Sequence, residues 1–400
     1  MVYISKIPAH TCIKQIVLLL LVLSSAGLST AQGVQTCDMK AAVQQINSEL
    51  ERKQYDQAAK ILDQQRACPA HSPLEIFQIG WFYGRARRFE TALHLFKTVP
   101  QEVPDPVTHN YAIALCKFEL GDYQGAIAIL KPVQLSGTGD TKSINLLAVS
   151  YSKLGWYRQA YAILAEQTQK DSGDLSLYLN LVTVCAEGGD FAKAAEVAAQ
   201  ARELFPSSPD VFIVQGAAAT LLGHLDQAYE DFAAGVRLAP SRTDARFFLA
   251  LTDYKQGKFS DALSILRNAV NGGLVDSDLY YLMAECLLKL ESANTNEALH
   301  ELDRAINLNA NSVSARTLRG KLVLDGGRAS EALPDLELAN RLDPDSRAVL
   351  YNLARAYRAL GRDSEAQSLF RKLQAQTADT FNEFTDTRLN DVLTGKGEQP

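Results

Sequence analysis

The stretch ELGDYQGAIAIL, residues 119–130, holds a phrase that the chain uses repeatedly: a glycine, an aromatic two positions later, and an alanine three positions after that. Close variants are LGWYRQA from Leu154, GGDFAKA from Gly188, QGKFSDA from Gln256 and LGRDSEA from Leu360. Such recurrence indicates one small structural unit that the chain builds many times.

The spacing of the phrase is regular. Steps of 34 residues from Gly121 reach Gly155, Gly189, Gly223 and Gly257, and after two extra residues near Glu291 the series resumes at Gly327 and Gly361. Backward steps reach Arg87 and Lys53. An alanine follows in every unit: Ala58, Ala92, Ala126, Ala160, Ala194, Ala228, Ala262, Ala298, Ala332 and Ala366. A fixed period of this length predicts a solenoid of stacked units.

Each letter of the phrase has a physical reason. The glycine is expected to end a first helix in a left-handed conformation. The aromatic, as in Tyr123, fills the turn to an antiparallel second helix. The alanine lies where the two helices approach most closely, so a larger side chain would cost about 1–3 kcal/mol. A second small residue seven positions before the glycine, such as Gly80 or Ala114, is expected to face this alanine.

The pattern resembles the tetratricopeptide repeat (TPR) family over about residues 39–380. The resemblance implies an all-α fold: a right-handed superhelical α-solenoid of antiparallel helix pairs. It also implies that the first helices line a concave groove for a peptide or protein segment. The expected repeats are 39–72, 73–106, 107–140, 141–174, 175–208, 209–242, 243–276, 277–312, 313–346 and 347–380.

Pro132 falls inside the expected second helix of the third repeat. Proline lacks an amide hydrogen and clashes with the preceding turn. We therefore expect that helix to end early and its stacking on the fourth repeat to be loosened.

The open end of a solenoid needs a cover. Phe381, Phe384, Leu389 and Val392 follow at helical spacing, and Thr380 with Glu383 has the form of a capping box. We interpret residues 380–393 as a C-terminal capping helix and residues 394–400 as a flexible tail.

The N-terminus has the features of a secretory signal peptide. Lys6 and Lys14 precede the apolar run 16–23, and small residues lead to Ala31. We expect residues 1–31 to be removed, which predicts an exported protein, periplasmic or extracellular, with no integral membrane span in the mature chain. The alternative is a segment that stays attached as a membrane anchor.

Five cysteines remain after the signal peptide. Cys37 begins the first helix and Cys68 ends its antiparallel partner, so in an oxidising compartment we expect them to form a disulfide. The alternative is two thiols. Cys116, Cys185 and Cys286 fall in separate repeats, too far apart to pair, and are expected to be buried.

No catalytic motif stands out in the sequence. The histidines lack metal-ligand spacing, and glycine-rich phosphate loops and Cys-x-x-Cys pairs are absent. The repeats also use almost the whole chain. We therefore expect neither an enzyme nor a cofactor or metal site, although an active site within the groove is the alternative. The net charge of −6, without a polybasic block, argues against nucleic acid as a partner.

Family positions that point into the groove supply candidate binding residues. They are Phe77, Trp81, Arg85, Tyr111, Phe118, Phe247, Tyr254, Tyr281, Tyr351 and Arg355. Aromatic residues and arginine carry much of the energy of interfaces. The alternative is that these side chains pack between helices. Asn180 and Asn352 match the family position that bonds a peptide backbone, and Lys142 with Asn145 resembles a fragment of the family's carboxylate clamp.

The leading hypothesis is an exported interaction scaffold that binds a peptide or protein segment, with cell-envelope assembly or secretion as the setting. The alternative is an accessory subunit that binds polysaccharide or peptidoglycan. Aromatics beside acids and amides favour sugars, whereas aromatics beside arginine favour peptides. Trp81 and Arg85 share a helix face, which favours a peptide.

Overall fold

The computed structural model describes residues 39–67, 72–290 and 295–375. Within these ranges the chain forms twenty α-helices and no strand. It divides into two units, Met1–Gly189 and Asp190–Pro400, and each is described by itself. The expected signal peptide, the Cys37–Cys68 disulfide, the capping helix 380–393 and the tail 394–400 lie outside the described residues.

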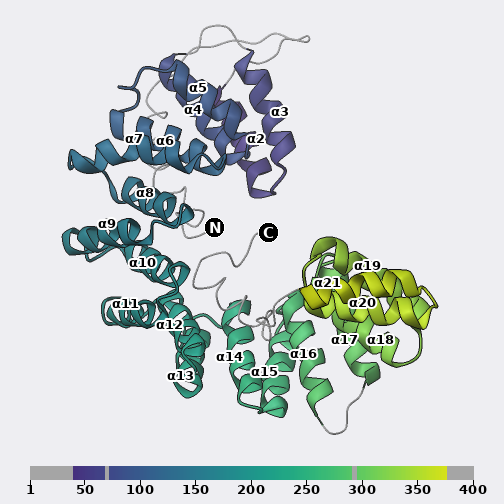
Figure 1. Cartoon of the computed structure of the whole chain (residues 1–400). Coiled ribbons are helices and arrows are strands. Elements are labelled where there is room, and N and C mark those ends of the chain that lie inside the picture. Colours follow the sequence, from purple (N-terminus) through teal and green to yellow (C-terminus); the bar gives the residue numbers. More distant parts are fainter. Residues whose placement is uncertain (1–38, 68–71, 291–294, 376–400) are drawn as a thin grey trace. The chain divides into compact units, whose positions relative to one another are not determined.

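In unit 1, consecutive helices pack side by side and antiparallel (Figure 1). Four helix pairs are followed by one further first helix. They are α2 (Met39–Glu51) with α3 (Tyr55–Arg66), α4 (Pro73–Arg85) with α5 (Phe89–Thr98), α6 (Pro106–Glu119) with α7 (Tyr123–Leu135), α8 (Thr141–Lys153) with α9 (Tyr157–Lys170), and α10 (Leu175–Glu187).

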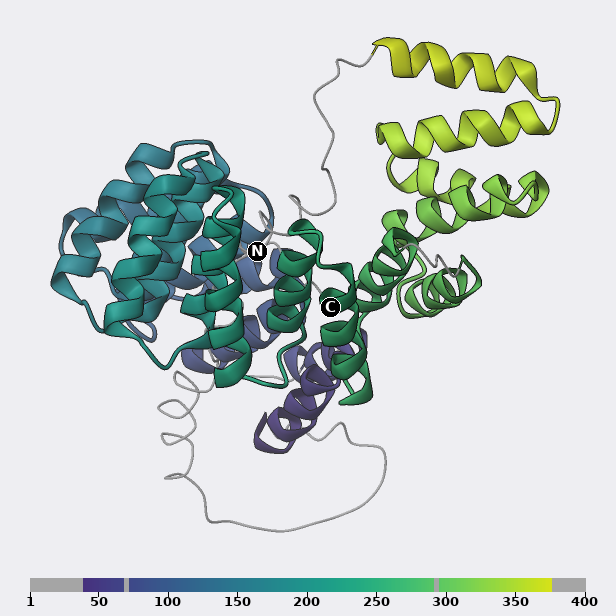
Figure 2. The same cartoon turned by 90° about the horizontal axis from the view of Figure 1, so that it is seen from below.

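Unit 2 repeats the same arrangement and ends in the pair α20 and α21, drawn in yellow in Figure 2. Its helices are α11 (Phe191–Leu204), α12 (Pro209–Leu221), α13 (Leu225–Leu238), α14 (Thr243–Lys255), α15 (Phe259–Asn271), α16 (Ser277–Lys289), α17 (Thr295–Leu308), α18 (Val313–Asp325), α19 (Ala329–Leu342), α20 (Arg347–Ala359) and α21 (Asp363–Ala375). The predicted all-α solenoid of helix pairs is confirmed.

The repeated phrase forms the turn between the helices of a pair. Gly121 has a φ of 80°, and the amide of Asp122 donates to the carbonyl of Lys117 at 2.8 Å, closing the end of α6. The Asp122 carboxylate then accepts from the amide of Gly125 at 2.8 Å and caps α7. Lys53 and Arg87, which replace the glycine in the first two repeats, adopt the same turn with a φ of 59°.

The prediction for the repeated alanine is confirmed. All ten alanines have at most 1% of their surface exposed. The neighbour expected for the second small residue was wrong, however. A Cβ on Gly80 would lie 2.8 Å from Phe96, and one on Gly320 would lie 2.7 Å from Leu336. Each of these large residues follows its repeated alanine by one helical turn, so the small residue makes room for the next layer of side chains.

The sequences of four other repeats show matching compensation in size. In four repeats the small residue is alanine and the residue opposite is leucine, whereas Gly320 stands opposite Leu336 and Ala354 opposite Phe370. The combinations are Ala114 with Leu130, Ala148 with Leu164, Ala250 with Leu266, and Ala284 with Leu302. All eight of these side chains are buried, so in these repeats a smaller side chain at one position accompanies a larger residue at the other.

The expectation that α7 ends early was wrong. The helix continues through Pro132 to Leu135. Pro132 and Ala128, whose carbonyl would have accepted the missing bond, are both exposed. The unbonded carbonyl therefore lies on the side of the helix that faces water, where a proline is tolerated.

Cys116, Cys185 and Cys286 are buried, as predicted. Burial is the main cause that raises the pKa of the Cys116 and Cys286 thiols to about 12. The negative charge of Glu119 adds to the rise at Cys116, and that of Glu285 adds to it at Cys286. No helix within the described ranges is long and apolar enough to cross a membrane.

Candidate functional site

Trp81 and Tyr111 pack together between two first helices of unit 1, and Arg85 follows Trp81 by one helical turn; these three residues are named here the Trp81 patch. The rings of Trp81 on α4 and Tyr111 on α6 lie 6.4 Å apart between centroids. Tyr111 is buried, whereas Trp81 is only partly buried and packs at the edge of the core cluster. One part of the indole is therefore anchored and the rest faces solvent.

Arg85 follows Trp81 by one helical turn on α4 and is held in a fixed position by contacts with α2 and Phe82. Its Nη1 donates to Oδ1 of Asn47 on α2 at 2.7 Å, and its guanidinium lies 5.8 Å from the centre of the Phe82 ring. Burial lowers the pKa of Arg85, and Glu51 opposes that change. A partly desolvated cation in one orientation attracts a carboxylate more strongly than a fully hydrated surface cation does.

Phe77 and Phe118, like Tyr111, are buried, so three of the predicted groove residues of unit 1 lie in the core. Phe77 is buried and its ring lies 4.9 Å from that of Phe96. Phe118 is buried and its ring lies 5.2 Å from that of Tyr123. Both side chains present almost no surface to a ligand.

A polar seam of Asn145, Ser176, Asn180 and Glu187 runs between α8 and α10. Nδ2 of Asn145 donates to Oγ of Ser176 at 2.9 Å. The amide oxygens of Asn145 and Asn180 have no hydrogen-bond partner among the described residues, although both side chains are 1% exposed. An unpaired buried acceptor costs about 1–3 kcal/mol, so this seam is short of hydrogen-bond donors.

The end of the polar seam is charged. Glu187 accepts a hydrogen bond from Oγ of Ser152 and pairs with Nζ of Lys153 at 3.1 Å. The sequence placed Asn180 at the family position that bonds a peptide backbone and Asn145 in a fragment of the carboxylate clamp. The pairing of Asn145 with Ser176 depends on how α8 and α10 are rotated against each other, which the sequence did not show.

In unit 2, three predicted groove residues are committed to other contacts. Phe247 is buried against Phe248, with ring centres 5.3 Å apart. The hydroxyls of Tyr254 and Tyr281 both donate to the Glu285 carboxylate, at 3.1 and 2.9 Å. Burial, followed by the charge of Glu285, raises the pKa of both phenols. The two tyrosines therefore surround a carboxylate and not an arginine.

The last pair of helices holds an open pocket of about 880 Å³, named here the α20–α21 pocket. Tyr351, with 52% of its surface exposed, lines it together with Phe370 and the arginines Arg347, Arg358 and Arg371. The predicted Arg355 has its guanidinium carbon 5.7 Å from the centre of the Tyr351 ring. Its Nη2 donates to Asp325 at 2.7 Å, which links α20 to α18.

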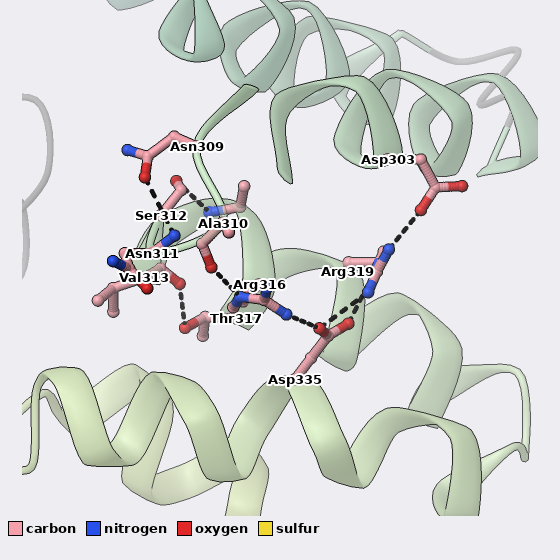
Figure 3. A network of polar contacts seen from close by, with 11 residues as sticks. Asp303, Asn309, Ala310, Asn311, Ser312, Val313, Arg316, Thr317, Arg319 and Asp335 are labelled. Carbon is pink, nitrogen blue, oxygen red and sulfur yellow. Dashed lines mark hydrogen bonds and ion pairs between the residues drawn. The ribbon is translucent and has the colours of Figure 1, made fainter. Parts of the chain in front are cut away.

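Other arginines of unit 2 are used for internal ion pairs. Figure 3 shows Asp335 on α19 accepting from Arg316 at 2.6 Å and from two nitrogens of Arg319 at 2.6 and 2.8 Å. Arg319 also reaches Asp303 on α17 at 2.5 Å. The network joins three consecutive helices and satisfies its own charges, so we assign it to packing and not to ligand binding.

Asn352, at the family position that bonds a peptide backbone, is also satisfied internally. Its Nδ2 donates to the carbonyl of Ala348 within α20 at 2.8 Å. Among the described residues, no cluster of three or more histidine, cysteine, aspartate or glutamate side chains could hold a metal ion.

Family models agree with the repeat pattern. Models of the tetratricopeptide repeat match residues 323–384 and 283–346, and a model of anaphase-promoting complex, cyclosome, subunit 3 matches residues 232–305. The chain is a tetratricopeptide-repeat protein. No curated protein matches this TPR protein.

Solved structures with a similar fold include other TPR proteins. One from Parabacteroides merdae is 15% identical and covers 62% of this chain and 98% of its own, with a TM-score of 0.50. Yeast Tom70 is 16% identical, and the match covers 89% of this chain and 95% of Tom70, with a TM-score of 0.43. YrrB, described as a TPR protein with an unusual peptide-binding site, is 23% identical. The match covers 50% of this chain and 98% of YrrB, with a TM-score of 0.35.

Proposed function

We propose that this TPR protein is an interaction scaffold that binds an extended segment of a partner protein across the first helices of unit 1. The observation that carries the proposal is the Trp81 patch, in which a partly exposed indole packs on Tyr111 and a fixed arginine follows one helical turn later on α4. Buried aromatic anchors next to arginine are typical of the residues that dominate binding energy at interfaces. TPR proteins generally bind proteins or peptides, which agrees with this assignment.

The polar seam is not part of the proposed site, because the Asn145 and Asn180 oxygens are buried and a surface peptide cannot reach them. An extended segment would place an apolar side chain on Trp81 and a carboxylate near Arg85. The chemistry expected of the partner is an acidic segment with an aromatic or aliphatic anchor.

We further propose that the protein is exported and non-catalytic. The support for export is the charged, apolar and small-residue pattern of residues 1–31. Peptide sequencing of the protein from its own cell should find Gln32 at the mature N-terminus and the protein outside the cytoplasm. An intact Met1 on the soluble form would contradict export without affecting the proposed binding site.

One observation favours a polysaccharide or peptidoglycan ligand instead. Tyr254 and Tyr281 lie beside Glu285 in unit 2, and aromatic rings next to carboxylates suit sugar rings. Both hydroxyls already donate to that carboxylate, however, so little hydrogen-bonding capacity is left for a sugar. A glycan array on the mature chain separates this function from peptide binding.

The experiment for peptide binding is selection from a random peptide library on immobilised mature chain, residues 32–400. Peptides are counter-selected on the Trp81→Ala variant, and Trp156→Ala is the matched control. Trp156 is 42% exposed and packs on Tyr151 in a turn of the same unit, away from the Trp81 patch. We expect acidic peptides with an apolar anchor that bind wild type and the control alike. Selection of peptides that ignore Trp81 and Arg85 would contradict the proposal.

A further inference from the structure

The turn within each helix pair has an unusual residue in the first two repeats. Seven of the described repeats place a glycine there with a φ of 73° to 80°, as at Gly121, whereas Lys53 and Arg87 hold a φ of 59°. A left-handed backbone brings Cβ close to the following carbonyl oxygen, and among L-residues mainly asparagine and aspartate adopt it readily. Two cations are therefore kept where glycine would give a more stable turn.

Contacts within the fold do not account for these two side chains. Lys53 and Arg87 are exposed, and neither forms an ion pair within residues 39–67, 72–290 and 295–375. A Cβ built on any of the seven glycines meets nothing within 4 Å, so a Cβ at this position packs against nothing. Burial raises the pKa of Glu119, and the charge of Arg87 only opposes that rise. Backbone strain without an internal reason is a pointer to function.

The two turns are neighbours. Nη2 of Arg88, which precedes α5, pairs with Oδ1 of Asp56 in the first turn of α3 at 2.5 Å. That ion pair neutralises its own charges and does not involve Lys53 or Arg87. These two cations are named here the basic edge.

The basic edge lies at the same ends of α2 and α4 as Arg85 of the Trp81 patch. Arg85 is the last residue of α4 and precedes Arg87 by two residues. Its Nη1 donates to Asn47 on α2, the helix that ends two residues before Lys53. A segment that lies on the Trp81 patch and continues past Arg85 therefore reaches the basic edge.

The basic edge spans only two turns. In the third turn Lys117 is paired with Asp122 at 2.5 Å, so the run of unpaired turn cations stops there. The chain as a whole has a net charge of −6, which repels an extended anionic surface such as a membrane. A short acidic polypeptide segment is the partner that fits both the length of the basic edge and the charge of the protein.

We propose that the basic edge binds the acidic end of the partner segment whose apolar anchor lies on Trp81. This inference rests on the proposed function and names the part of the partner that extends beyond Arg85. Exposed cations at the rim of an interface attract carboxylates from a distance, so they raise the association rate more than they slow dissociation. The strain at the two turns is then retained because glycine would stabilise the chain but remove both charges.

The test measures rates and stability in the mature chain, residues 32–400. The probe is one acidic peptide from the library selection described above, labelled with fluorescein and followed by stopped-flow mixing. Lys53→Gly combined with Arg87→Gly should raise the midpoint of urea denaturation. The same variant should associate about threefold or more slowly at low ionic strength, with a nearly unchanged dissociation rate. High salt should remove the difference because it screens exposed charges, and Trp81→Ala should instead speed dissociation.

Two matched variants isolate the contribution of charge. Lys53→Arg combined with Arg87→Lys keeps both charges at the turns and should associate like wild type. Lys131→Gln combined with Lys170→Gln removes two exposed cations from α7 and α9 of the same unit, and should leave the association rate nearly unchanged.

An unchanged association rate in the Lys53→Gly, Arg87→Gly variant would overturn this inference, as would an equal loss in the Lys131→Gln, Lys170→Gln variant. Binding of wild type to phosphatidylglycerol vesicles that the Lys53→Gly, Arg87→Gly variant loses would assign the basic edge to a lipid surface and would also overturn it. In each of these outcomes, faster dissociation from Trp81→Ala would leave the proposed function standing. Dissociation that is the same from wild type and Trp81→Ala would contradict the proposed function itself.

Discussion

Gly216→Ala tests whether paired volumes set the spacing of the two helices in a repeat. The added Cβ would lie 2.9 Å from Cε1 of Phe232 and 3.0 Å from two further ring carbons. Phe232 is fully buried and stacks on Phe248, with ring centres 5.4 Å apart, so it has little room to move. Overpacking of this kind costs about 1–3 kcal/mol, while alanine gains about 1 kcal/mol over glycine within a helix. We expect a net loss of about 1 kcal/mol.

The effect of Gly216→Ala on the free energy of unfolding should reverse its sign when the Phe232 ring is removed. In the Phe232→Leu background, Gly216→Ala recreates the alanine and leucine combination found at Ala114 and Leu130, and should stabilise by up to about 1 kcal/mol. Urea denaturation of the four proteins of the cycle gives the coupling energy. Gly84→Ala is the control without a clash, because a Cβ there meets nothing within 4 Å. If Gly216→Ala stabilised the protein in both backgrounds, volume pairing would not set the spacing.

Three further predictions concern the turns, one buried carboxylate and the thiols. Lys53→Gly should stabilise the protein by about 1 kcal/mol because glycine adopts a φ of 59° without strain, and Gly121→Ala should destabilise it by a similar amount. The midpoints of urea denaturation measure both effects. Burial raises the pKa of Asp231 to about 6, with Arg202 opposing the rise and Glu230 adding to it. The folded state therefore holds a proton between about pH 4 and 6 that the unfolded state releases, and stability falls by up to about 3 kcal/mol as pH rises through that window. Asp231→Asn should flatten this dependence, and a variant that keeps the wild-type slope would contradict the assignment. Cys116 and Cys286 should resist iodoacetamide at pH 8 in the native protein, and rapid native labelling by mass spectrometry would show that they are not buried.

The sequence was sufficient for the fold because solenoid contacts are local. The alanine at Ala126 and its equivalents reports a contact within one repeat, and the turn at Gly121 depends on a few neighbouring residues. Pro132 was misjudged because the pattern of one helix does not show that its missing hydrogen bond lies on the side facing water. The partner of Gly80 was misplaced by one turn because the stagger of two helices is a three-dimensional property.

The candidate site was less accessible from the sequence. Rules for inward positions identify which way a side chain points but not how deeply it lies, so Phe77 and Phe247 were grouped with Trp81 although they are buried. The polar seam depends on the rotation of α8 against α10. The α20–α21 pocket exists because the described stack ends there, which no repeat position indicates.

The most direct test of the interaction scaffold is a matched pair of affinity and stability measurements. Isothermal titration of one selected acidic peptide is performed on wild type, Trp81→Ala and Trp156→Ala, with the melting temperature of each protein measured alongside. The account predicts that Trp81→Ala weakens binding by about 30-fold, or 2 kcal/mol, with a nearly unchanged melting temperature, while Trp156→Ala binds like wild type. A Trp81→Ala protein that melts early but binds with unchanged affinity wherever it remains folded would show that Trp81 is a packing residue and that the site lies elsewhere.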